Sequence, residues 1–325
     1  MKLIYNVDAK PKQIGYLKTI LFAFQQLLAI MAATIAVPAI IGNGMSASAA
    51  LFGAGDGTLI YQLFTKFKSP VFLGSSFAFL GSMGTAFSGA ISAGIFNEKL
   101  GHLGIIIGAI FGGLVYVLLS ILVKFVGVNW INKLMPAVVI GPTVAIIGLS
   151  LAGNAIGDLS KGSVLASNQV PLASPYIALI CGLVTLFTTI LCSTYGKKTL
   201  KMIPFICGIL AGYATATIFT VIGHVTNNSE LLVIDFAKFN NIQWIPDFTF
   251  LKAAEGIQDL SWSYIATIAV AYIPVAFVVF AEHIADHKNL SSIIEKDLLE
   301  EPGLHRTLLG DGVGSMVGAF FGGCP

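Results

Sequence analysis

Two acidic side chains lie near the end of a long apolar segment, AYIPVAFVVFAEHIADHKNLSS. Glu282 follows a run without charge, and Asp286, four residues on, shares its face if the segment is helical. Ionisable groups within a membrane span are costly and usually functional. Two carboxylates in a poorly solvated place can retain a proton between them, as a proton-coupled carrier requires. The alternative is that Glu282 lies at the inner membrane interface with no such role.

His283 and His287 repeat the same spacing on a neighbouring face of this segment. Two imidazoles one turn apart could ligate zinc, but a zinc site needs at least a third protein ligand, and the sequence offers none nearby. We therefore expect no metal site here. At the membrane boundary, both imidazoles are expected to be solvated.

A second feature is the segment SPVFLGSSFAFLGSMGTAFSGAI, which is rich in glycine and serine. It opens after Pro70 with a short extended stretch, Val71–Leu73, and Ser75 and Ser76 then precede a helical pattern. Serine before an apolar helical run is typical of a helix N-cap. A helix that starts partway through a membrane is typical of transporter substrate sites. A kinked full-length helix is the alternative.

Other polar side chains interrupt apolar runs. Asp56 lies in GAGDGTL and Asp311 in LLGDGVGSMVG, where each is either structural or functional. Gln25 and Gln26 are adjacent in the first apolar run, so on a helix one amide can face a pocket while the other bonds a neighbouring helix.

Several classes of function lack their sequence signals. There is no phosphate-binding glycine loop, no nucleophile elbow and no CxxC pair, and the four cysteines have no metal-ligand spacing. A net charge of +2 is too small to indicate a basic surface that binds nucleic acid. We therefore expect neither an enzyme nor a cofactor.

The composition indicates a polytopic membrane protein. Hydrophobic residues make up 56% of the 325 positions and charged residues 10%, against about 25% charged in soluble domains. A spanning helix needs about 20 apolar residues. Nine apolar segments of spanning or near-spanning length are predicted, the last one incomplete: 16–41, 47–67, 71–91, 101–123, 136–156, 176–195, 203–225, 264–285 and from about 308. In the fourth, Gly104, Gly108 and Gly112 predict a close-packing face.

Positive charge orients these segments. With the N-terminus in the cytoplasm, fourteen of the 18 Lys and Arg residues fall in inner segments and four in outer ones. Cytoplasmic loops are enriched in these residues. The polar stretch 227–263 then lies outside, where it covers the outer face or holds a short amphipathic helix.

Four stretches carry a resemblance to a known family: QQLLAIMAATIAVP, PVFLGSSFAFL, AEHIADHKNLSSIIEKDLLEEPGLHR and GDGVGSMVGAFFGGCP. The chain resembles the nucleobase–cation symporter (nucleobase–ascorbate transporter) family, in its bacterial uracil-permease branch. The resemblance implies an all-α fold of seven plus seven spans in inverted repeats, with core and gate domains and a third span built from a short strand and a half-helix. It also implies proton-coupled uptake of uracil across the cytoplasmic membrane, and a homodimer.

The same resemblance assigns residue roles. Glu282 matches a glutamate that contacts the base, Phe77 a residue whose backbone N–H meets a substrate carbonyl, and Ala33 a small residue lining the pocket, with Ser76 beside Phe77. Glu282, Asp286 and Asp311 are the expected proton relay; Asp286 stands where some uracil permeases carry a histidine.

The implied domains are a core part at 1–130, a gate part at 131–226, an extracellular loop at 227–263 and a second core part at 264–325. The family's tenth-span signature, with a second substrate-contacting glutamate, would follow Pro325, so the second repeat is expected to be incomplete. The alternatives are a xanthine or other purine symporter of the same family, an anion carrier on the same architecture, and a non-functional truncated fragment. The carboxylate of Glu282 argues against an anion.

Overall fold

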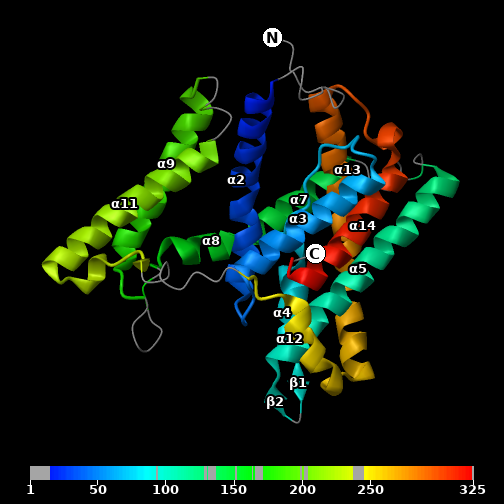
Figure 1. The fold of residues 1–325 in the computed structure, drawn as a ribbon, viewed down its shortest axis with the longest axis horizontal. Helices are drawn as coiled ribbons and strands as arrows, with labels where there is room; N and C mark the ends of the chain where they lie inside the picture. Colours follow the sequence, from blue (N-terminus) through cyan, green and yellow to red (C-terminus); the bar gives the residue numbers. More distant parts are fainter. Residues whose placement is uncertain are drawn as a thin grey trace. The chain divides into compact units, whose positions relative to one another are not determined.

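The computed structural model describes residues 15–92, 94–127, 130, 137–150, 152–162, 164, 171–197, 200, 204–236 and 245–323 (Figure 1). The chain separates into two compact units. The first comprises residues 1–21, 30–149 and 245–325, and the second comprises residues 22–29 and 150–244. Both are built from helices, and the β structure of the described residues is one two-stranded hairpin.

The helices of the first unit come from three separate stretches of the chain. Their bounds are α2 Tyr16–Ile41 (whose residues 22–29 group with the second unit), α3 Ala47–Phe64, the 3-10 turn η1 Phe77–Phe79, α4 Leu80–Ser88, α5 Glu98–Val126, α7 Ala137–Ser150, α12 Thr249–Gly256, the turn η4 Ile257–Asp259, α13 Trp262–Ile294, the π-turn η5 Leu299–Gly303 and α14 Leu304–Phe321. The strands β1 Ile91–Ser92 and β2 Ile95–Phe96 pair antiparallel between α4 and α5.

Local sequence explains where these helices begin. Asn97 caps α5 by accepting the N–H groups of Lys99 and Leu100. Ser46 and Ser261 do the same for α3 and α13, accepting the N–H groups three residues on. Such caps satisfy backbone donors that the first helical turn leaves free.

Glycine lets α3 and α14 approach closely. A Cβ atom on Gly53 would lie 2.3 Å from the carbonyl oxygen of Gly318, and one on Gly57 would lie 2.8 Å from that of Gly314. Small residues at such a crossing bring two membrane helices into backbone contact. α14 also packs on α5, and α5 packs on α13, so α3, α14, α5 and α13 form one continuous layer of contacts.

The close-packing face predicted on α5 is confirmed, but its partners are aromatic. A Cβ on Gly104 would lie 2.1 Å from the hydroxyl of Tyr264, and one on Gly108 would lie 2.4 Å from the ring of Tyr272. The Tyr264 hydroxyl donates to the carbonyl oxygen of Ala86 at 2.7 Å, which ties α13 to α4.

The second unit is described by itself. It contains α8 Ala152–Leu159, α9 Pro175–Tyr195, α11 Pro204–Thr226 and the turn η2 Ser229–Leu231. α9 and α11 pack on one another. Gly208 fits against α9, because a Cβ there would lie 2.8 Å from the carbonyl oxygen of Thr185.

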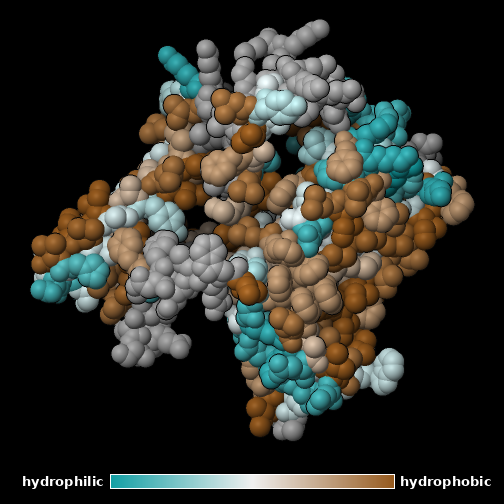
Figure 2. All heavy atoms as spheres, in the orientation of Figure 1, coloured by the Kyte–Doolittle hydropathy of each residue, from teal (hydrophilic) through white to brown (hydrophobic). Residues whose placement is uncertain are grey.

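Most predicted spans correspond to helices, with revised ends. Among the described residues α5, α9, α11 and α13 are long and apolar enough to cross a membrane. Much of the surface in view is hydrophobic (Figure 2). Phe125 of α5 and Val270 of α13 are among the exposed hydrophobic side chains. α13 extends beyond the predicted end at residue 285 to Ile294. The fifth segment is two helices, α7 and α8, and its residues 136 and 151 lie outside the described residues.

The polar stretch 227–263 does contain a short helix. α12 buries Thr249, Ala253 and Gly256 on one face, so it is amphipathic as predicted. Residues 237–244 of that stretch lie outside the described residues.

Candidate functional site

The third apolar segment is broken, as its sequence predicts. Residues 70–76 are not helical, and the chain then enters η1 and the nine-residue α4. The expected short strand at 71–73 is not formed: these residues pair with no strand in the described structure. Their backbone instead bonds to side chains of α3, which explains the difference.

Two α3 side chains satisfy this broken backbone. The N–H of Leu73 donates to the hydroxyl of Thr58 at 3.0 Å, and the amide of Gln62 donates to the carbonyl oxygens of Ser69 and Val71 at 2.8 and 2.9 Å. Unbonded backbone groups at membrane depth are costly. Side-chain bonds therefore stabilise the interruption that positions the half-helix.

The half-helix is fixed against α2 and α13. The Ser75 hydroxyl donates to the carbonyl oxygen of Thr34, and the Ser82 hydroxyl to that of Ala271 at 2.8 Å. The rings of Phe79 and Tyr272 stack with centroids 5.4 Å apart. The predicted serine cap is wrong in detail: Ser76 occupies the N-cap position of η1, but its side chain makes no capping hydrogen bond.

Glu282 is half-buried on α13, and no hydrogen bond or ion pair of its side chain is present among the described residues. Asp286 and Asp311 are close enough to act on it electrostatically. Asp286 is exposed, whereas Asp311 on α14 is 19% exposed. The three predicted carboxylates therefore form one acidic neighbourhood, in which Glu282 retains its full capacity to accept hydrogen bonds.

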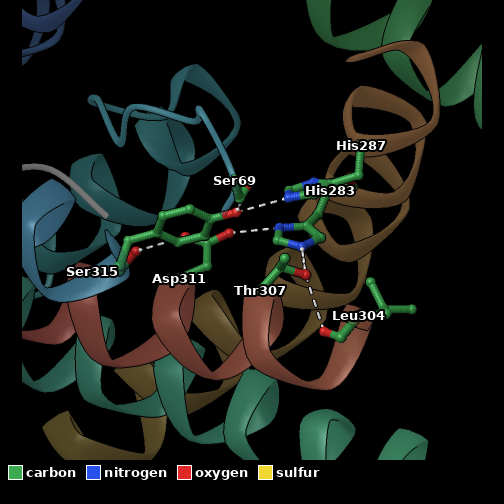
Figure 3. A network of polar contacts seen from close by, with 8 residues as sticks. Ser69, His283, His287, Leu304, Thr307, Asp311 and Ser315 are labelled. Atoms are coloured by element: carbon green, nitrogen blue, oxygen red, sulfur yellow. Dashed lines mark hydrogen bonds and ion pairs between the residues drawn. The ribbon is translucent and has the colours of Figure 1, made fainter. Parts of the chain in front are cut away.

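The imidazoles of His283 and His287 are buried, so the expectation that they are solvated is wrong. Figure 3 shows the His283 ring facing Asp311 and Thr307. α13 continues for slightly more than three turns past Glu282, and α3 and α14 cover this part of it. The two rings stack with centroids 4.0 Å apart. His283 contacts the Asp311 carboxyl at 2.8 Å and the Thr307 hydroxyl at 3.1 Å.

His287 connects to α3 through Tyr61. Its Nε2 lies 2.9 Å from the Tyr61 hydroxyl, which lies 2.8 Å from the hydroxyl of Ser69. Ser69 begins the interrupted segment, so the network extends from the buried histidines to the residues that precede the half-helix.

The remaining predicted residues take separate positions. Phe77 is half-buried and packs against the main hydrophobic core, and Ala33 is exposed beside the buried Thr34. Asp56 is half-buried and Gln26 exposed, while the side chain of Gln25 lies outside the described part of the chain. Of the elements that carry these residues, η1, which contains Phe77, packs against α13, which contains Glu282. The substrate roles given to Glu282, Phe77, Ser76 and Ala33 stay predictions.

Sequence reasoning missed Thr307 and Tyr61, and it did not join His283 to Asp311. A signal was available on α14, where Thr307, Asp311 and Ser315 recur every four residues and so share one helix face. Within the described residues, no group of three or more His, Cys, Asp or Glu side chains could hold a metal ion.

Helices of spanning length, apolar outer surfaces and a buried polar network define a multi-pass helical membrane protein. A family model described as the Permease family, Xan_ur_permease, matches residues 17–325. The chain therefore belongs to this permease family.

Curated relatives agree with that assignment. The chain is 35% identical over 308 residues to a uracil permease of Bacillus caldolyticus, covering 94% of this chain and 63% of that protein. It is 35% identical to the uracil permease of Bacillus subtilis, with the same two coverages. It is 33% identical to the uracil permease of Escherichia coli K12, covering 95% of this chain and 63% of that protein. The chain thus spans less than two thirds of the length of these relatives.

Proposed function

We propose that this protein takes part in proton-coupled uptake of uracil across the cytoplasmic membrane, with its N-terminus in the cytoplasm. The observation that carries the proposal is the half-buried, unbonded carboxylate of Glu282 on an apolar helix that the broken third segment packs against. Relatives named uracil permeases, aligned over nearly all of this chain, support uracil as the substrate.

The chemistry of uracil suits these groups. Its ring N–H groups are donors that a carboxylate such as Glu282 accepts. Its carbonyl oxygens are acceptors for a backbone N–H at the start of the half-helix, the role proposed for Phe77, with Ser76 and Ala33 lining the same pocket. Asp286 and Asp311 are the proposed proton relay.

Alternating access would then move a core part, 1–130 and 264–325, relative to a gate part, 131–226, with the stretch 227–263 outside. The uracil permeases to which this chain is similar are longer than the chain. The part of such a protein that the chain does not match would supply further spans. A homodimer is part of the same proposal.

The test is uptake of labelled uracil by cells that lack their own uracil carrier and express this protein as its gene encodes it. We expect uptake that is faster at acid than at neutral external pH and that excess unlabelled uracil suppresses. Stronger suppression by xanthine than by uracil would instead assign a purine substrate. Good expression without uptake of either base would reject the proposal.

A further inference from the structure

The two buried histidines of α13 lie one turn apart, yet their hydrogen-bond partners differ in the number of protons that they can hold. Both rings are nearly inaccessible, with His283 6% and His287 2% exposed. Which ring nitrogen carries a proton follows from what each partner can donate or accept.

His287 is complete as a neutral ring. Its Nδ1 lies 2.8 Å from the carbonyl oxygen of His283, which only accepts, so Nδ1 carries the hydrogen. Its Nε2 then accepts the hydroxyl hydrogen of Tyr61 at 2.9 Å, and the Tyr61 oxygen accepts that of Ser69 at 2.8 Å. Every donor in this series of hydrogen bonds meets an acceptor without an additional proton.

His283 can hold one proton more than a neutral ring beside an ionised carboxylate. When the Thr307 hydroxyl donates to the carbonyl oxygen of Leu304 at 3.0 Å, its oxygen accepts the Nε2–H of His283 at 3.1 Å, and one further proton lies between Nδ1 and Oδ2 of Asp311, which are 2.8 Å apart. When the same hydroxyl donates to Nε2 instead, a neutral ring donates its Nδ1–H to the carboxylate and the further proton is absent.

The groups that interact with the His283–Asp311 pair among the described residues are acidic or neutral. On α13, Glu282, Asp286 and His287 lie beside it, and the Tyr116 ring of α5 meets the His283 ring edge-on with centroids 5.8 Å apart. Tyr61 of α3 is within electrostatic reach of Asp311.

We infer that the His283–Asp311 pair is a proton-binding site, and that, if the proposed function holds, it binds the coupling proton. In the loaded state one proton is shared by Nδ1 and Oδ2, and the pair is neutral overall. On release, the ring loses its Nε2 proton and keeps an Nδ1–H that donates to the Asp311 carboxylate. The Thr307 hydroxyl must then rotate from Leu304 to Nε2, so it reports the state of the pair.

This site would couple to substrate through Glu282. Asp311 acts electrostatically on the Glu282 carboxyl. A proton on the pair removes negative charge beside that carboxyl and favours its ionised form, which accepts the N–H groups of a nucleobase. Proton binding at His283–Asp311 and substrate binding at Glu282 would therefore strengthen one another, and the linkage is reciprocal.

Uptake measurements test the coupling in the protein as its gene encodes it. Asp311→Asn keeps a hydrogen bond, because its amide N–H can donate to Nδ1, but removes the titrating proton. The ratio of uracil uptake at acid pH to uptake at neutral pH should fall to about one in Asp311→Asn, because the carboxylate that shares the proton with His283 is gone. Glu255→Gln is the control: it removes an exposed carboxylate of α12 that pairs with Lys99, and it should keep the wild-type ratio. An Asp311→Asn protein that keeps full acid stimulation overturns the coupling role.

A second measurement does not depend on transport. In purified wild-type protein labelled with nitrogen-15 in histidine and carbon-13 in the aspartate carboxyl, the His283 and Asp311 signals can be identified by their loss in His283→Gln and Asp311→Asn. We expect the pair to hold one proton beyond a neutral ring and a carboxylate at neutral pH, and His287 to stay neutral. A neutral His283 beside an ionised Asp311 throughout the titration overturns the proton site. A protein that shows the proton but moves no uracil overturns the proposed function alone.

Discussion

The layer formed by α3, α5, α13 and α14 differs from the α9–α11 pair in where its polar side chains direct their hydrogen bonds. In the first region they bridge helices: Tyr61 reaches His287, and His283 reaches Asp311. In the second, threonine hydroxyls return to carbonyl oxygens of their own helix, as Thr185, Thr189 and Thr217 do. Among the described residues, buried histidines occur in the first region, whereas the α9–α11 pair buries the thiol of Cys181. The first region is therefore suited to chemistry and the second to scaffolding.

The largest expected effect comes from separating α3 and α14 in the first region. Gly57→Ile places a side chain against the backbone of Gly314, which cannot move aside without parting the helices. We expect a loss near the upper end of the about 1–3 kcal/mol that overpacking costs. Thermal unfolding in detergent measures it. Gly55→Ala, two residues away with open space around the new methyl group, should be neutral or slightly stabilising. Equal losses in both variants would contradict the packing described.

The next effect concerns the bridge between α3 and α13. Tyr61→Phe removes the hydroxyl that joins Ser69 to His287 and leaves the imidazole Nε2 without a donor. We expect a loss of about 1–2 kcal/mol in the free energy of unfolding, the upper range for side-chain hydrogen bonds in membrane helices. Tyr213→Phe, on an exposed face of α11, is the control and should change nothing measurable. A Tyr61→Phe protein as stable as its control would mean that the bridge contributes no stability.

A smaller effect tests the scaffold region. The Thr220 hydroxyl accepts the backbone N–H groups of Val233 and Ile234, each at 3.1 Å, and so fixes the chain that follows η2. Thr220→Val should cost about 1 kcal/mol and increase proteolysis around residues 229–236. Thr217→Val removes only a bond to its own helix and should stay within about 0.5 kcal/mol of wild type. If Thr217→Val is the more damaging of the two, the distinction between the two kinds of threonine fails.

The smallest effect is expected at an exposed ion pair. Lys99 of α5 bonds Glu255 of α12, and both side chains are more than half exposed. Exposed pairs contribute about 0–1 kcal/mol and are screened by salt. Lys99→Gln should therefore lower the unfolding temperature slightly at low salt and not at high salt. A large, salt-independent loss would indicate that this contact carries more of the fold than the buried networks do.

Sequence patterns predicted the existence of most helices because long apolar runs leave few alternatives in a membrane. They also located the interruption before Phe77, because glycine, serine and proline are concentrated there. They did not predict how the interruption is stabilised: Thr58 and Gln62 look like ordinary polar residues of α3 until the fold brings residues 69–73 against them.

The candidate site was predicted in part for the same reason. Glu282 and Asp311 stand out because charge is rare in apolar runs. The burial of His283 and His287 could not be read from α13 alone, because it depends on Tyr61 of α3 and Thr307 of α14, which are distant in sequence. Long-range contacts of this kind decide whether a boundary histidine is solvated or part of a network.

The account depends most directly on Glu282 as the group that binds the nucleobase. Labelled uracil uptake should be compared between Glu282→Gln and Glu255→Gln in cells that express equal amounts of each protein. Glu255→Gln alters an exposed surface carboxylate and should transport like wild type. Glu282→Gln should abolish uptake, because an amide presents a donor where a carboxylate accepts the ring N–H. Undiminished uptake by Glu282→Gln would contradict the central claim.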